Sequence, residues 1–224
     1  MGRMSSLVAA DGHRLDAYEA TPAGPARGGI VVVQEIFGIN DHIRRVADDF
    51  AANGYRVVAP ALFDRVRRNI TLGYTDADIA EGRSIRSRVT FEHALADVGA
   101  AQAMLGDDGR VGIVGYCWGG TVTWLAAARL EGFAAASSYY GGGIGQFASE
   151  HPRCPTQCHF GEKDHAIPLH EVDAVRSANP DVEVFTYAAG HGFNCDARAS
   201  YDANAAALAR ERTLAFFARH VARG

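Results

Sequence analysis

A glycine-rich turn between an apolar run and a helix-forming segment constrains this chain more than any other feature. The apolar run is Val111-Gly112-Ile113-Val114, the turn is Gly115-Tyr116-Cys117-Trp118-Gly119-Gly120, and the helix-forming segment is Thr121-Val122-Thr123-Trp124-Leu125-Ala126-Ala127-Ala128. Glycines on both sides of Cys117 leave room for a sharp turn that strains the backbone of its central residue. A strand, a turn and a helix in this order place the Cys117 thiol at the carboxyl edge of a sheet, beside a helix N-terminus that favours negative charge.

This turn is typical of the nucleophile elbow of α/β-hydrolases, with cysteine where most members carry serine. The alternative is that Cys117 is only a small buried apolar residue, because free cysteine is among the most buried residue types. In this fold an acid and then a histidine follow the nucleophile along the chain. Asp164 and His191 come just after two apparent strands, 156–161 and 182–188. Both are therefore expected on loops at the same sheet edge as Cys117, and we interpret the three residues as a catalytic triad.

Strand-like and helix-like segments alternate along the rest of the chain. Strands are predicted at 6–10, 15–20, 29–33, 55–60, 111–114, 133–140, 156–161 and 182–188, and helices from residue 40 or 41 to 54 and at 90–105, 119–130, 169–177 and 204–221. Asp11-Gly12 is typical of a hairpin turn, and the segment 65–81 is polar and is predicted to be irregular. The pattern predicts an α/β fold with a mostly parallel twisted sheet, an antiparallel N-terminal ribbon and helices on both faces. We expect one domain over residues 1–224.

Composition excludes some classes of function. The formal net charge is −4 with no basic block, which argues against nucleic-acid binding and implies no other class of partner. No apolar stretch is long enough for a signal peptide or a membrane span, so we expect a cytoplasmic protein. A monomer is plausible.

Four cysteines allow two alternatives to catalysis. A reducing cytosol opposes disulfides between them. Cys154 and Cys158 with His159 form a possible metal motif, but the spacing lacks a second matched pair and we interpret both residues as structural thiols. We expect no metal and no cofactor.

Glu35 ends the apolar run that begins at Val31, where a carboxylate is unfavourable unless it is paired or solvated. A nearby thiol would give it a role, because a carboxylate can hold the S–H group by a hydrogen bond or accept its proton. We therefore expect the Glu35 carboxylate to point toward the Cys117 thiol. The alternative is a glutamate that only caps the next turn.

With these motifs the chain resembles the dienelactone hydrolase family, also called carboxymethylenebutenolidases. The resemblance is carried by Gln34-Glu35-Ile36-Phe37-Gly38, the Cys117 turn, Tyr139-Tyr140-Gly141, Asp164, Gly190-His191-Gly192-Phe193 and the stretch from Ala205 to Leu214. It implies a compact α/β-hydrolase that opens an enol-lactone such as dienelactone during the breakdown of chloroaromatic compounds. It also implies a Cys-Asp-His triad, a glutamate at Glu35 that holds the resting thiol, and an oxyanion hole formed by the backbone N–H groups of Ile36 and Trp118.

Substrate contacts are less defined by the resemblance. Well-studied members hold a substrate carboxylate with arginines, one of them a few residues after the catalytic histidine. Here that position is Cys195 and the nearest arginine is Arg198. A second arginine would be Arg83, Arg86 or Arg88, each of which could equally belong to a solvated helix face. Phe37, Tyr140 and Phe193 lie in the shared motifs and are expected to contact the substrate.

Two other functions stay open at this point. One is a broader esterase or thioesterase of the same fold, which a panel of substrates would distinguish. The other is a thiol redox sensor, which needs a resolving cysteine close to Cys117. Cys195 is the candidate near the site, but a sensor has no use for a complete triad.

Overall fold

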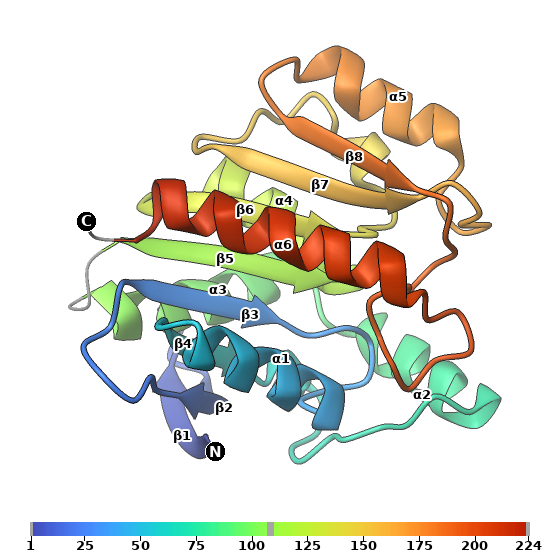
Figure 1. Ribbon diagram of the computed structural model, residues 1–224. Helices are drawn as coiled ribbons and strands as arrows, with labels where there is room; N and C mark the ends of the chain where they lie inside the picture. The colour runs from blue at the N-terminus through green and yellow to red at the C-terminus, as the bar shows by residue number, and fades with distance from the viewer. Residues whose placement is uncertain (1, 107–109, 223–224) are drawn as a thin grey trace.

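The structure is a computed structural model that describes residues 2–106 and 110–222. Its centre is an eight-stranded sheet with the strand order β1-β2-β4-β3-β5-β6-β7-β8 (Figure 1). The strands are β1 (Arg3–Val8), β2 (Arg14–Ala20), β3 (Gly29–Val33), β4 (Arg56–Pro60), β5 (Val111–Tyr116), β6 (Phe133–Tyr139), β7 (Thr156–Gly161) and β8 (Glu183–Tyr187).

The sheet is mostly parallel with an antiparallel start, as the sequence predicts. β1 pairs antiparallel with β2 and β2 with β4, and all other neighbours run parallel. β3 and β5 are buried along their whole length, as expected of strands covered on both faces. The register matches Val33 with Gly115 and Tyr116 with Tyr139, so the chain leaves these strands at one common edge. This edge carries the candidate site.

Helices cover both faces of the sheet. They are α1 (Asp41–Ala52), α2 (Asp76–Arg86), α3 (Phe91–Leu105), α4 (Trp118–Arg129), α5 (Leu169–Ala178) and α6 (Ala203–His220), with short 3₁₀ turns η1 (Leu62–Arg65) and η3 (Ile144–Phe147). α1 and α6 lie on the face toward the viewer in Figure 1, and α3 and α4 lie behind the sheet. Phe50 of α1 meets Phe217 of α6 at 5.9 Å between ring centroids, which joins the two helices over the core. None of the described helices is both long and apolar enough to cross a membrane.

The segment predicted to be irregular contains a helix, α2, so that prediction is wrong. α2 buries only Gly82 and Ile85, and so it has too few apolar residues to show a helical period. The signal that we missed is a capping box, in which Thr75 accepts a hydrogen bond from the Asp78 N–H and Asp78 accepts one from the Thr75 N–H. A Cβ atom at Gly82 would collide with the carbonyl oxygen of Ile36. α2 therefore packs closely on the loop that follows β3.

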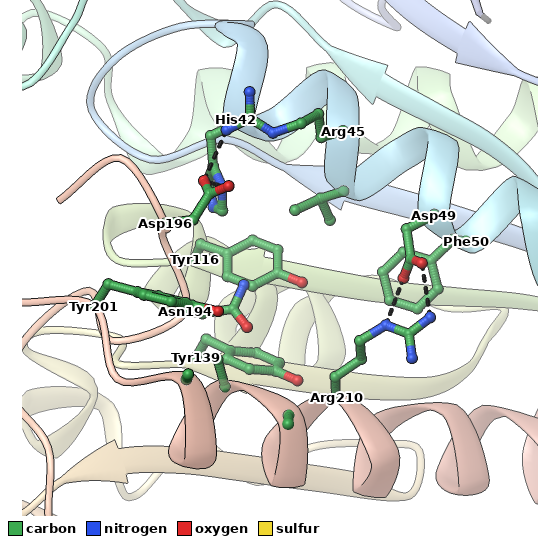
Figure 2. A pocket seen from close by; sticks show the side chains of 14 residues that line it. His42, Arg45, Asp49, Phe50, Tyr116, Tyr139, Asn194, Asp196, Tyr201 and Arg210 are labelled. Atoms are coloured by element: carbon green, nitrogen blue, oxygen red, sulfur yellow. Dashed lines mark hydrogen bonds and ion pairs between the residues drawn. The ribbon is translucent and has the colours of Figure 1, made fainter.

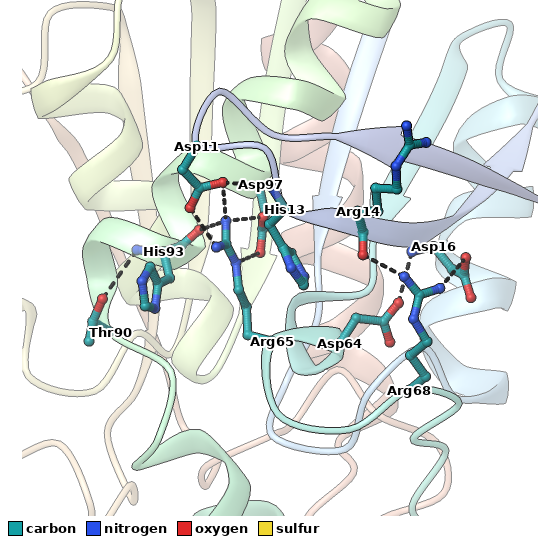
Figure 3. Close-up of polar contacts among 10 residues, drawn as sticks. All are labelled: Asp11, His13, Arg14, Asp16, Asp64, Arg65, Arg68, Thr90, His93 and Asp97. Carbon is teal, nitrogen blue, oxygen red and sulfur yellow. Dashed lines mark hydrogen bonds and ion pairs between the residues drawn. The ribbon is translucent and has the colours of Figure 1, made fainter.

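The N-terminal hairpin differs from the prediction in its turn. β1 ends at Val8, two residues before the predicted end, because Ala9 and His13 close a longer turn through a backbone hydrogen bond. Arg65 of η1 fastens this turn to α3 by ion pairs of 2.5 Å with Asp11 and 2.6 Å with Asp97 (Figure 3). The Asp97 side chain is fully buried, and burial raises its pKa although Arg65 opposes the shift. Arg65 thus supplies the charge that a buried carboxylate needs.

Candidate active site

Cys117 occupies the strained turn that the sequence predicts. It caps the N-terminus of α4 with φ 56° and ψ −121°, a backbone conformation that residues with a Cβ atom rarely adopt. A Cβ atom at Gly115 would collide with the Gly119 carbonyl, and one at Gly119 would collide with the backbone of Val33 and Gln34. The glycines are therefore needed for α4 to pack this closely on β3 and β5. Cys117 is a free cysteine of intermediate burial.

The structure brings His191 and Asp164 to this thiol from two other loops. His191 Nε2 lies 3.1 Å from Cys117 Sγ, and His191 Nδ1 lies 2.7 Å from Asp164 Oδ2. Asp164 is buried and its other oxygen accepts a hydrogen bond from the Ala166 N–H at 2.8 Å. Burial by itself lowers the pKa of His191, but the charge of Cys117 and the hydrogen bond to Asp164 raise it to about 10. The surroundings of His191 therefore favour its protonated imidazolium form.

The sequence assigns an oxyanion hole to the backbone N–H groups of Ile36 and Trp118. Trp118 is the first residue of α4, and the first N–H groups of a helix lack acceptors within the helix. Ile36 lies in the turn after β3, and its N–H has no acceptor among the described residues. The Trp118 ring is buried and stacks on Phe63 at 5.7 Å. An oxyanion hole at these two N–H groups stays a prediction.

Glu35 is fully buried, but its hydrogen bonds differ from the expectation. Arg198 Nη1 donates to Glu35 Oε1 at 3.2 Å, and the Tyr74 hydroxyl lies 3.4 Å from Oε2. Within residues 2–106 and 110–222, Glu35 forms no hydrogen bond to Cys117, whose sulfur contacts His191 instead. The physical reason is charge, because a buried carboxylate gains more from a guanidinium than from a neutral thiol.

Comparison with known proteins identifies the family. The dienelactone hydrolase family model matches residues 15–221. The chain belongs to the dienelactone hydrolase family. It is 33% identical over 225 residues to a Pseudomonas putida protein named "Carboxymethylenebutenolidase", covering 95% of this chain and 94% of the relative. A Synechocystis protein named "Putative carboxymethylenebutenolidase" is 35% identical over 208 residues, 84% of each chain.

A solved structure agrees with this membership. It is described as a "Putative Dienelactone Hydrolase" from Klebsiella pneumoniae, has a TM-score of 0.85 and 30% identity, and covers 98% of this chain and 100% of its own. The chain is therefore an ester or lactone hydrolase of the dienelactone hydrolase family with an α/β-hydrolase fold, as the resemblance of its motifs implied.

Three aromatic residues expected to contact substrate are buried in this member of the family. Phe37, Tyr140 and Phe193 are each at most 1% exposed. Tyr140 packs edge-on against the His191 ring at 5.2 Å, and Phe193 packs on Tyr140 at the same distance. Phe37 lies under Tyr74 at 4.6 Å. These rings pack against each other and against His191 and Tyr74, and their contact with substrate stays a prediction.

The candidate arginines differ in their surroundings. Arg198 faces Glu35, and a Cβ atom at Gly192 would collide with its guanidinium. Arg86 lies over the Phe91 ring at 5.5 Å, Arg83 is exposed on α2, and Arg88 is exposed just after α2. Tyr74, which contacts Glu35, was not predicted, because it lies in the polar segment where no pattern indicated order.

Proposed function

We propose that this enzyme hydrolyses its substrate through a cysteine acyl-enzyme, with Cys117 as nucleophile, His191 as acid and base, and Asp164 as the residue that orients His191. The single observation that supports this most is the chain of contacts from Cys117 Sγ to His191 Nε2 at 3.1 Å and from His191 Nδ1 to Asp164 at 2.7 Å. Nucleophile, base and orienting acid within hydrogen-bond reach is the signature of nucleophilic catalysis.

In acylation the Cys117 thiolate attacks the lactone carbonyl carbon and a carbon–sulfur bond forms. The carbonyl electrons move to its oxygen, which accepts hydrogen bonds from the N–H groups of Ile36 and Trp118. Removal of one such donor typically costs about 10²- to 10³-fold in rate. The tetrahedral intermediate then collapses, the ring carbon–oxygen bond breaks, and the imidazolium of His191 protonates the leaving enolate.

In deacylation water attacks the thioester that joins the substrate to Cys117. His191, now neutral and held by Asp164, takes one proton from this water. The second tetrahedral intermediate expels the Cys117 thiolate and releases the acid. The imidazolium and thiolate of the resting enzyme are restored, so protons balance over the cycle. An enolate is a good leaving group, which suits a thiol nucleophile because thiolates themselves leave readily from difficult intermediates.

We propose an enol-lactone that carries a free carboxylate, such as dienelactone, as the substrate. Arg198 is the residue that would bind this carboxylate, since it lies against Glu35 at the site and is partly exposed. A substrate carboxylate would compete with Glu35 for the same guanidinium, and the displaced Glu35 would then face the thiol. The four free cysteines suit a reducing cytoplasm, where such lactones arise during the breakdown of aromatic compounds.

A substrate panel tests this proposal. Wild-type enzyme and the Cys117→Ala variant are assayed with dienelactone, its methyl ester, an aryl acetate and an acyl thioester, and Cys154→Ala serves as the matched thiol control. We expect Cys117→Ala to lose at least about 10⁴-fold in kcat and Cys154→Ala to keep full activity. We expect kcat/KM for dienelactone to exceed that of its methyl ester by about 10- to 100-fold, the value of one hydrogen bond between charged groups.

Two results would contradict different parts of the proposal. Activity that survives in Cys117→Ala would exclude Cys117 as nucleophile. Equal kcat/KM for the free acid and the methyl ester would exclude recognition of a carboxylate by Arg198 and would favour a broader esterase or thioesterase. In that case the triad assignment is retained and only the substrate class changes.

A further inference from the structure

Glu35 also belongs to a second cluster of side chains, whose other members the proposed reaction does not use. His42 from the first turn of α1 and Cys195 from the loop after His191 lie beside it, and all three residues are buried. One ligand atom from each lies within 4.8 Å of the others, and within residues 2–106 and 110–222 this is the one group of three metal-ligating residue types that lie so close together. We call Glu35, His42 and Cys195 the rear cluster.

The His42 ring has a buried nitrogen that forms no hydrogen bond to any described residue. The residue is 5% exposed, and its Nε2 has no hydrogen-bond partner within the described part of the chain. Its Nδ1 lies 3.9 Å from the Asp196 carboxylate, which is beyond hydrogen-bond distance. An imidazole nitrogen without a hydrogen-bond partner can offer its lone pair to a metal ion.

One residue of the rear cluster, His42, lines a cavity. His42 and Asp196 line a cavity of about 410 Å³ between α1 and α6, with Tyr116 and Tyr139 at its floor (Figure 2). Cys117 and His191 do not line this cavity. A small cation can therefore approach His42 without passing the catalytic thiol.

We propose that the rear cluster binds a soft divalent cation of the Zn²⁺ type. Thiolate, imidazole and carboxylate are the ligand set that zinc prefers, and three protein ligands leave a fourth position for water. A tetrahedral zinc ion with bonds of about 2.0–2.3 Å holds its ligand atoms about 3.3–3.8 Å apart. Since the ligand atoms lie within 4.8 Å of one another, the cluster contracts by no more than about 1–1.5 Å to reach this geometry.

Metal binding exchanges the proton of Cys195 for the cation. A metal–sulfur bond forms and the thiol proton is released to water. Glu35 can keep its hydrogen bond to Arg198 through Oε1, because the contact of Oε2 with Tyr74 is the longer one at 3.4 Å. The divalent cation and the Arg198 guanidinium then face one carboxylate and one thiolate, which leaves one net positive charge at the site.

Binding at the rear cluster would remove Glu35 from the reaction. If the substrate carboxylate displaces Glu35 from Arg198, a metal that holds Glu35 opposes this exchange and lowers activity. This consequence rests on the proposed function, whereas the binding itself does not. The experiment therefore measures binding first and activity second.

The test uses Co²⁺ as a spectroscopic probe and Zn²⁺ as its competitor on the purified enzyme. We expect one equivalent of Co²⁺ to give a sulfur-to-cobalt charge-transfer band that one equivalent of Zn²⁺ removes. Cys195→Ser should lose the band. His42→Asn should weaken Zn²⁺ binding more than about 10-fold in competition with a chromogenic chelator, since loss even of outer partners of metal ligands costs about 10- to 100-fold.

Two matched thiol variants separate the rear cluster from the catalytic pair. Cys117→Ser and Cys154→Ser should both keep the band at full intensity. A band that persists in Cys195→Ser but vanishes in Cys117→Ser would overturn the proposal and place the metal on Cys117 and His191. Absence of any band in folded wild-type enzyme would overturn it as well. Zn²⁺ inhibition, with each variant normalised to its own metal-free rate, should be weaker in Cys195→Ser and His42→Asn.

Discussion

Arg198 Nη1 donates a hydrogen bond to Glu35 Oε1 at 3.2 Å, which joins two residues that are 163 positions apart. The Glu35 side chain is fully buried and the Arg198 side chain is 18% exposed. The two charges therefore differ in their access to solvent, since only Arg198 can be hydrated if its partner is removed. Ring faces of Phe37 and Tyr74 lie 5.8 and 5.9 Å from the guanidinium and hold it in place.

Because the two side chains differ in exposure, we expect substitution of Arg198 and substitution of Glu35 to lower the free energy of unfolding by different amounts. Arg198→Leu leaves a buried carboxylate without a counter-charge and should lower the free energy of unfolding by about 3 kcal/mol. Glu35→Gln keeps an acceptor for Arg198 and should cost only about 1 kcal/mol. The double variant, Arg198→Leu with Glu35→Gln, should regain most of the stability that Arg198→Leu alone loses. Urea unfolding of the three variants measures these differences.

The control for this cycle is the exposed pair of Arg210 with Asp49, at 2.7 Å. Arg210→Leu should change stability by less than about 1 kcal/mol, because exposed ion pairs contribute little. A double variant as unstable as Arg198→Leu would show that the loss comes from packing and not from the unpaired charge.

Strain at the nucleophile gives a second prediction. Cys117 has φ 56°, and such conformations cost residues with a Cβ atom about 1–3 kcal/mol. Cys117→Gly should therefore raise the free energy of unfolding by about 1 kcal/mol after the entropic cost of glycine is subtracted. Cys117→Ala keeps the Cβ atom and should show no such gain. Equal stability of the two variants in thermal unfolding would mean that the turn is not strained.

The candidate triad and the sheet were predictable because local patterns determine them. The glycines around Cys117 specify the turn, and Asp164 and His191 follow strands whose parallel order brings their loops to one edge. The family resemblance also predicted which backbone N–H groups form an oxyanion hole, those of Ile36 and Trp118.

The Glu35 contact was not predictable in the same way. It depends on how the loop after His191 folds back, which places Arg198 against Gly192 and brings its guanidinium to Glu35. The sequence of such a loop has no repeating pattern of apolar residues from which its conformation could be predicted. Helix α2 and Tyr74 were missed for the same reason, because few apolar residues mark the segment between η1 and α3.

The pKa of His191 predicts the alkaline limb of the activity profile. His191 has a pKa of about 10, above its usual value of 6.5, and in the proposed cycle its protonated form donates to the leaving enolate. The imidazolium is present below pH 10 and is lost above it, so kcat/KM should stay level through neutral pH and fall as pH rises through about 10. Asp164→Asn removes one cause of the raised pKa and should move this limb to lower pH. A limb that does not move would contradict the role of Asp164.

Reactivity of the resting thiol gives the last prediction. In the proposed cycle Cys117 acts as a thiolate beside His191, whose Nε2 lies 3.1 Å from Cys117 Sγ, whereas Glu35 faces Arg198. Iodoacetamide should therefore label Cys117 rapidly at neutral pH in the free enzyme, as followed by mass spectrometry of its peptide. His191→Asn should slow labelling at least 10-fold, because only the thiolate reacts and its partner is gone.

The Glu35→Gln variant distinguishes a thiolate beside His191 from the neutral thiol held by Glu35 that the sequence predicts. If Glu35 held a neutral thiol, Glu35→Gln would accelerate labelling of Cys117. Since Glu35 is paired with Arg198, we expect the labelling rate of Glu35→Gln to remain within about twofold of wild type. Cys158 is fully buried, and burial raises its pKa to about 12, so it should stay unlabelled and report that the fold is intact. Faster labelling of Cys117 in Glu35→Gln, with Cys158 still protected, would show that Glu35 restrains the thiol despite its contact with Arg198.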